Sequence, residues 1–180
     1  MRLYVPATLA DLASVTNNLT EIIWTVPGRP AHAVTEALIA ALPEEDAEGL
    51  EYAAFLAAAH DSLLLVADAA TSGDTDVGGE LLRVVVAVDV PDGAVHGVHE
   101  ARDADADPSR VCVHEAIPGV EIVAVHVDEP VAAPDIQAML NAAAIHTVAG
   151  DALLAEATAR VEDRALLWYA PAELAQIPRG

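Results

Sequence analysis

Alternating aliphatic residues over residues 81–90 constrain the fold of this chain more than any other feature. One face of the segment carries only aliphatic residues, at Leu82, Val84, Val86, Val88 and Val90. The opposite face mixes apolar residues with Arg83 and Asp89. Successive side chains of a strand point to opposite faces, so the pattern predicts a strand with one face in a hydrophobic core. Residues 121–127 repeat it with three valines and predict a second strand.

Turn and capping residues place the remaining elements. Further strands are expected at residues 2–5 and 165–169, and a hairpin is expected to pair residues 96–100 with residues 111–114. Helices are expected at residues 8–15, 36–42, 44–70, 134–145 and 151–162.

Without the hairpin and the extra helices, the order of elements is β-α-β-β-α-β. That is the ferredoxin-like order, in which helices pack on one face of an antiparallel sheet. We therefore predict an α+β fold with a ferredoxin-like core, extra helices and an inserted hairpin. The alternative is another mixed α/β sheet with helices on one or both faces. A chain of 180 residues suits one domain, residues 1–180.

The charge balance excludes several functions. Asp and Glu number 29 against 8 basic residues, all of them Arg, and the formal net charge is -21. Without lysine there is no Schiff-base lysine and no Walker-type phosphate loop. Scattered arginines on so acidic a chain do not form a phosphate-binding patch, and an anionic membrane surface would repel it. We expect neither a nucleic acid nor a membrane as partner.

Cysteine usage and hydropathy favour a cytoplasmic protein. The single Cys112 cannot form an internal disulfide, which suits a reducing compartment. The N-terminus has no long apolar segment of the kind that a signal peptide requires. Nor does any run reach the ~18 apolar residues of a membrane span.

The best metal-ligand candidates are His96, His99 and His114, with Glu115 beside them. The predicted hairpin can bring these imidazoles together, but a zinc site needs three or four convergent ligands and only the sequence proximity supports one here. The alternative interpretation is a set of exposed histidines that titrate independently. We predict no catalytic residue and no cofactor from the sequence.

Polar and aromatic residues inside the predicted strands are the other candidates. Arg83, Asp89 and His126 could frame a pocket, or could simply face water on a helix-free side of the sheet. Trp168 and Tyr169 end the last strand and either pack in the core or, if exposed, anchor an interface.

Five short segments resemble a family of uncharacterised actinobacterial proteins, a domain of unknown function. They read MRLYVPAT, LEYA, RVVVAVD, VHVD and LLWYAP, and begin at residues 1, 50, 83, 125 and 166. The resemblance rests on their order and spacing across most of the chain. It implies a cytoplasmic protein of high-GC Gram-positive origin and carries over no activity and no functional residue.

Three functional hypotheses follow. The first is a non-catalytic binding or regulatory module that self-associates, or binds a protein partner, through an open sheet face. The second is a small metal-dependent or small-molecule-binding enzyme that uses the clustered histidines. The third is an acidic decoy for a basic partner, which predicts one continuous carboxylate face and salt-sensitive binding.

Overall fold

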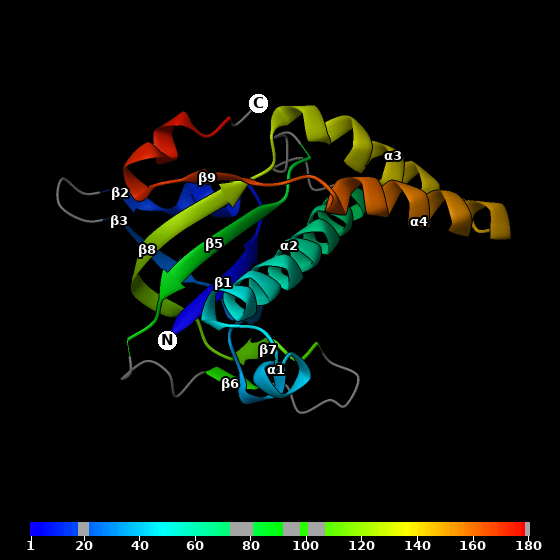
Figure 1. Ribbon diagram of the computed structural model, residues 1–180. Helices are drawn as coiled ribbons and strands as arrows, with labels where there is room; N and C mark the ends of the chain where they lie inside the picture. Colours follow the sequence, from blue (N-terminus) through cyan, green and yellow to red (C-terminus); the bar gives the residue numbers. More distant parts are fainter. Residues whose placement is uncertain (18–21, 73–80, 92–97, 101–106, 179–180) are drawn as a thin grey trace.

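The computed structural model describes residues 1–17, 22–72, 81–91, 98–100 and 107–178 (Figure 1). Its strands are β1 (Arg2–Ala7), β2 (Thr16–Asn17), β3 (Ile22–Val26), β4 (Pro30–His32), β5 (Val84–Asp89), β6 (Val98–Glu100), β7 (Arg110–Val113), β8 (Ile117–Val127) and β9 (Leu167–Tyr169). Its α-helices are α1 (Glu36–Ala41), α2 (Ala47–Ser72), α3 (Ala133–Ala143) and α4 (Val148–Glu162), and its 3-10 helices are η1 (Asp11–Ser14), η4 (Pro130–Ala132) and η5 (Pro171–Gln176).

The described strands form an open antiparallel sheet. Its order is β2-β3-β8-β5-β1-β4-β7-β6, and β9 pairs with β8 outside this path. Each described strand pair is antiparallel. The predicted hairpin is present, because β6 pairs with β7 and sets Val98 opposite Val113. The chain therefore has a mixed α+β fold.

The ferredoxin-like topology is not found in the strand pairing. That topology is a split β-α-β, in which another strand separates the two strands that a helix connects. Here β1 and β5, which lie before and after α2, are direct antiparallel neighbours, with Leu3 opposite Val88 and Val5 opposite Val86. The order of elements along a chain fits several strand orders, and side-chain packing selects one of them. The alternative expectation, a sheet of another topology, describes the molecule better.

The side chains of β5 divide between two cores as their alternation predicts. Val84, Val86 and Val88 belong to the larger core cluster, whereas Val85 and Ala87 pack with α2 on the other face. All five are buried. A period of two in the sequence was therefore sufficient to orient this strand.

The sheet face opposite α2 is covered rather than open. Leu12 of η1 and Leu174 of η5, together with Ile177, belong to the same buried cluster as the strand residues of that face. An open sheet face for self-association was the expectation, and on this side of the sheet it is wrong. The two 3-10 helices replace the solvent there because the strand residues beneath them are uniformly aliphatic.

Helix α2 packs across the other face of the sheet. It begins at Ala47, later than predicted, because Oδ1 of Asp46 accepts the backbone N–H of Gly49 at 3.0 Å and caps the first turn. In its middle, the Ser62 hydroxyl donates to the carbonyl of Ala7 at 2.8 Å and accepts from the N–H of Val84 at 2.8 Å. These bonds join α2 to β1 and β5.

By length and composition alone, the part of α2 at Ala47–Thr71 could cross a membrane. No run of this length and hydropathy was expected from the sequence. A core helix of this composition passes the same test, and the hydrogen bonds of Ser62 place this one against the sheet. The absence of a membrane partner stays a prediction.

Helices α3 and α4 form a hairpin that extends away from the sheet beside the C-terminal half of α2 (Figure 1). A small separate cluster holds it to α2, formed by Leu63, Val66, Ile136, Met139, Ala157 and Val161. Thr147 caps α4 by accepting the N–H of Gly150 at 3.1 Å. This hairpin brings the chain back to β9, whose side chains complete the site described next.

Candidate functional site

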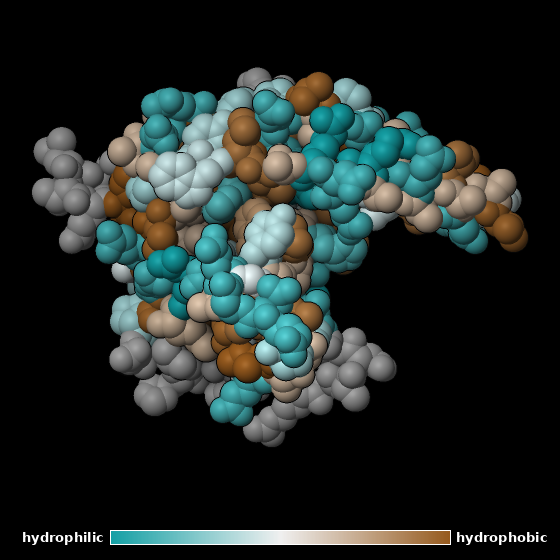
Figure 2. Space-filling model, in the orientation of Figure 1, coloured by the Kyte–Doolittle hydropathy of each residue, from teal (hydrophilic) through white to brown (hydrophobic). Residues whose placement is uncertain are grey.

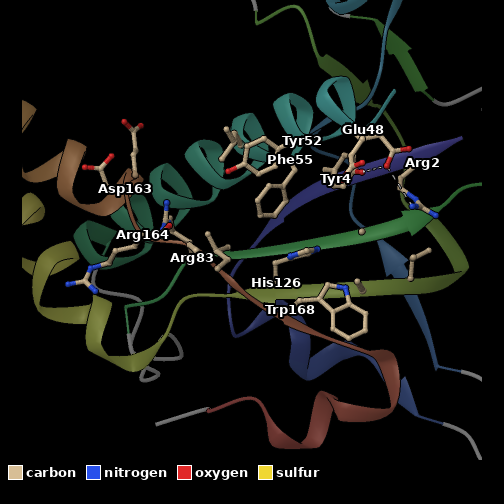
Figure 3. Close-up of a pocket in the computed structure, with 18 residues that line it drawn as sticks. Arg2, Tyr4, Glu48, Tyr52, Phe55, Arg83, His126, Asp163, Arg164 and Trp168 are labelled. Atoms are coloured by element: carbon tan, nitrogen blue, oxygen red, sulfur yellow. Dashed lines mark hydrogen bonds and ion pairs between the residues drawn. The ribbon is translucent and has the colours of Figure 1, made fainter. Parts of the chain in front are cut away.

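A groove of about 530 Å³ lies between α2 and the paired strands β8 and β9 (Figure 3). Helix α2 supplies Tyr52 and Phe55, β8 supplies His126 and β9 supplies Trp168. Tyr52 and Phe55 share one side of the helix because they are three residues apart. His126 and Trp168 share one face of the sheet because they are paired directly across the two strands.

Phe55 is the centre of the aromatic lining. Its ring centroid lies 4.7 Å from that of His126 and 6.0 Å from that of Tyr52, whose ring is inclined by only 25°. Tyr4 approaches it edge-on at 6.3 Å. Tyr52 and Trp168 are each 60% exposed, although aromatic side chains are usually covered. Two large ring surfaces are therefore open to a ligand.

His126 is a partly buried imidazole in the lining of the groove. Burial lowers the pKa of the imidazole from its ordinary 6.5. The ring packs on Phe55 and contributes mainly an aromatic face to the groove. It was a candidate in the sequence because a polar residue inside an aliphatic strand is unusual, and the structure places it in the lining.

Arg2, at the β1 end of the groove, is bound by acidic residues. Its Nε and Nη2 donate to the two carboxylate oxygens of Asp89 at 3.1 and 3.0 Å. The Tyr4 hydroxyl donates to Glu51 at 3.0 Å. Burial, together with this bond and the charge of Glu51, raises the pKa of Tyr4 to about 12. This end of the groove is a closed set of hydrogen bonds.

Arg83, at the opposite end, is paired within the protein. Its Nε and Nη2 donate to the carboxylate of Asp128 at 2.9 and 2.8 Å, and both residues are almost fully buried. A second bond of Nη2 reaches the carbonyl of Arg164 at 2.9 Å. Of the two alternatives given for Arg83, it does not face water but lines the groove, with its guanidinium paired in the interior to Asp128. Asp89 is exposed, as the alternative of facing water predicted.

Arg164 is likewise bound, since its guanidinium donates twice to Oδ2 of Asp135 on α3. In Figure 3 its side chain points away from the rings. The carboxylates of Glu48 and Asp163 also line the groove. Neither makes a hydrogen bond or ion pair with another side chain in the described part of the protein. The groove thus combines bound arginines with two unpaired carboxylates.

The residues predicted at the end of the last strand separate onto different sides of the sheet. Trp168 lines the groove, whereas Tyr169 is partly buried and packs against the larger core cluster. Their alternation on β9 produces this division. The interface role predicted for the pair stays a prediction.

The predicted metal ligands are only partly described. His96 lies outside the described residues, and the backbone of His99 is paired with that of Cys112 in the β6–β7 hairpin. Within the described ranges, no three His, Cys, Asp or Glu side chains are grouped closely enough to hold a metal ion. The His96, His99 and His114 site stays a prediction.

A buried cluster around His32 was missed in the sequence. Its Nε2 lies 3.1 Å from Oδ2 of Asp61, its Nδ1 lies 2.7 Å from Oγ of Ser109, and that hydroxyl donates to Asp107 at 2.5 Å. His32 is 1% exposed and Ser109 is 0% exposed, so no substrate reaches either in this state. The cluster ties β4, α2 and β7 together. The sequence signal for this cluster was Asp61, an acidic residue in the middle of a mostly apolar helix, because a buried carboxylate needs a partner.

Tyr52 and Phe55 were also overlooked as functional residues. Two rings three positions apart on an Ala-rich helix could have signalled an aromatic surface, but their partners on β8 and β9 come from distant sequence. Figure 2 shows that hydrophilic residues cover much of this side of the molecule, with smaller hydrophobic patches between them. The groove is therefore a local feature on a polar surface.

Comparisons with known proteins identify the family alone. No curated protein and no solved structure matched the chain. A model of one protein family matches residues 1–177, which is nearly the whole chain. The protein therefore belongs to the family of unknown function DUF6912.

Proposed function

We propose that this protein is a non-catalytic binding module that holds a small organic ligand in the groove between α2 and β8–β9. The observation that carries the proposal is the pair of aromatic faces, Tyr52 and Trp168, each 60% exposed beside a cavity of about 530 Å³. Ligand pockets typically have volumes of about 300–1,000 Å³ and a largely apolar lining with a few polar groups.

The ionisable side chains of the groove support binding rather than catalysis. Arg2, Arg83 and Arg164 each have a carboxylate partner. Burial lowers the pKa of His126, and its ring packs on Phe55. General acid–base catalysis needs a positioned group whose proton is exchanged with the substrate. The three arginines and His126 hold their neighbours instead.

Native mass spectrometry of untagged protein from its own host tests this proposal. We expect extra mass matching a small molecule on the wild-type monomer, and its loss from Trp168→Ala. Leu153→Ala is the matched control, because this exposed apolar residue on α4 is outside the groove lining. A wild-type protein that carries no small molecule, and binds none from an extract of the host, would contradict the proposal.

Self-association is a second candidate function, favoured by the exposed apolar residues around the same groove. Tyr52, Leu56 and Trp168 are 60%, 44% and 60% exposed and all line it. A contiguous apolar patch of this kind is a common feature of interfaces. A bare dimer in the same mass spectra, converted to monomer by Trp168→Ala, would favour self-association over ligand binding.

A further inference from the structure

The charge of the ligand can be inferred from the groove. The arginines in its lining are paired with carboxylates, whereas two of its own carboxylates have no such partner among the described residues. Each arginine in its lining has a carboxylate partner: Arg2 has Asp89, Arg83 has Asp128 and Arg164 has Asp135. An anionic ligand would have to compete with these partners for the positive charge. Breaking the buried pair of Arg83 would leave a charge without compensation in the interior.

Asp163 is a carboxylate in an unfavourable position. It is the C-cap residue of α4, and the C-terminal end of a helix carries partial negative charge, which favours cations. Glu162, beside it, is satisfied by His60 at 2.7 Å, but Asp163 has no side-chain partner in the described part of the protein. A bound cation would supply the missing charge.

Glu48 has a different origin. It lies in the first turn of α2, where the helix dipole stabilises a carboxylate, so its position alone needs no ligand. Its contribution comes from lining the same groove as the rings. The argument for a cation therefore rests on Asp163 and the aromatic faces, and Glu48 adds to the local potential.

The exposed rings are suited to a cation. The face of an aromatic ring carries negative charge density, and Trp and Tyr attract cations placed over it. Tyr52 and Trp168 present such surfaces on the two sides of the groove (Figure 3). The net charge of -21 also gives the whole surface a potential that concentrates cations.

We propose that the groove binds a small organic cation, an amine, guanidine or quaternary ammonium on a flat or apolar body. The body packs on Tyr52 and Trp168, and the positive group lies on the Asp163 side of the rings, because Glu48 lies at the opposite, Arg2 end of the groove (Figure 3). This inference rests on the proposed function and adds the charge of the ligand to it. A free small molecule is the occupant, because the cavity of about 530 Å³ lies within the range of about 300–1,000 Å³ that is typical of small-molecule pockets.

Three probes of equal ring size test the charge: benzylamine, benzyl alcohol and benzoate. Binding is read from the fluorescence of Trp168, as the difference between wild type and Trp168→Phe. The only other tryptophan, Trp24, is 2% exposed and so is shielded from the probes. We expect benzylamine at neutral pH to bind about tenfold tighter than benzoate, with benzyl alcohol between them.

Variants that remove one carboxylate each show which residue causes the preference for a cationic probe. Asp163→Asn should weaken benzylamine binding about threefold, Glu48→Gln should weaken it less, and both should leave benzyl alcohol unaffected. Asp68→Asn is the matched control, since this carboxylate is also exposed and on α2 but outside the groove. It should change neither affinity. Added salt should weaken benzylamine binding, because exposed charges are screened.

The possible outcomes separate this inference from the proposed function. Binding of benzoate as tight as that of benzylamine, still dependent on Trp168, would overturn the cation and leave the groove as a binding site. No Trp168-dependent binding of any probe would overturn both. An arginine-containing tetrapeptide that binds more tightly than agmatine would overturn the free small molecule in favour of a polypeptide ligand.

Discussion

Helix α2 borders two regions that use charged residues in opposite ways. On one side, Asp61 accepts from Arg110 at 2.6 Å and lies 3.1 Å from His32, inside a closed network. On the other side, Tyr52 and Phe55 face a groove in which Asp163 has no side-chain partner among the described residues. A charge that finds its partners within the chain contributes to stability. A charge left unpaired beside exposed rings is available to a ligand.

The buried pair of Arg83 and Asp128 gives the largest expected effect and tests how much a charge that is paired within the chain contributes to stability. Asp128→Ala leaves the guanidinium of Arg83, which is 2% exposed, without its carboxylate. We expect the free energy of unfolding to fall by about 3–5 kcal/mol. Urea denaturation measures it.

Asp163→Asn is the matched control for that measurement. Its carboxylate is exposed, so the free energy of unfolding should stay within about 0.5 kcal/mol of wild type. Equal losses in both variants would break the distinction between closed and open charges.

Asp61→Asn tests the closed network on the side of α2 away from the groove. Burial acts to raise the pKa of Asp61, but the hydrogen bond with His32 and the charges of His32 and Arg110 outweigh it and hold the pKa below its ordinary 3.8. The carboxylate therefore stabilises the fold above pH 3.8, and this contribution is lost as the pH falls through the lower, folded-state pKa. At neutral pH the variant should lose about 1.5–3 kcal/mol.

Urea denaturation across acidic pH provides the check on Asp61. The difference between wild type and Asp61→Asn should shrink once the pH falls below 3.8, because the wild-type carboxyl is then protonated as well. A difference that stays constant with pH would show that the variant acts through packing and not through charge.

His126 sharpens the comparison because its imidazole titrates at a higher pH than the carboxyl group of Asp61. Burial lowers its pKa from 6.5, so the unfolded chain takes up a proton more readily than the folded one. Wild type should lose stability as the pH falls below 6.5, and His126→Gln should lack this part of the pH dependence. Chemical denaturation between about pH 7 and about pH 5 measures it. Parallel curves for the two proteins would contradict the burial of this imidazole.

How much the sequence predicts depends on how local the determining contacts are. The two faces of β5 follow from the alternation of Val84 to Val88, which needs no other part of the chain. The start of the helix expected at residues 36–42 also follows locally, since Thr35 accepts from the N–H of Leu38 at 3.0 Å and caps α1. Both were predicted correctly because their cause lies within a few residues.

Strand order and the groove could not be predicted in the same way. Whether β1 pairs with β5 or lies apart from it depends on packing between residues about 80 positions apart, and the order of elements fits both arrangements. Trp168 was recognised as a candidate, but its neighbours Tyr52 and Phe55 come from the far end of the chain. The sequence left open whether Arg83 frames a pocket or faces water, and its partner Asp128, which decides this, lies 45 residues away.

Trp168→Ala has the smallest expected effect on stability and separates the two regions most directly. The indole is 60% exposed, so its removal uncovers little core, and we expect the free energy of unfolding to fall by less than about 1 kcal/mol. Its removal takes away one of the two open ring faces, so ligand binding should be lost.

Trp24→Ala is the opposite case, since this indole is 2% exposed and its Nε1 donates to Ser14 at 3.1 Å. We expect Trp24→Ala to cost about 3–5 kcal/mol. Thermal denaturation of both variants, with benzylamine titration followed by isothermal titration calorimetry, should show stability lost in Trp24→Ala and binding lost in Trp168→Ala. A large stability loss in Trp168→Ala would mean that the groove is part of the core.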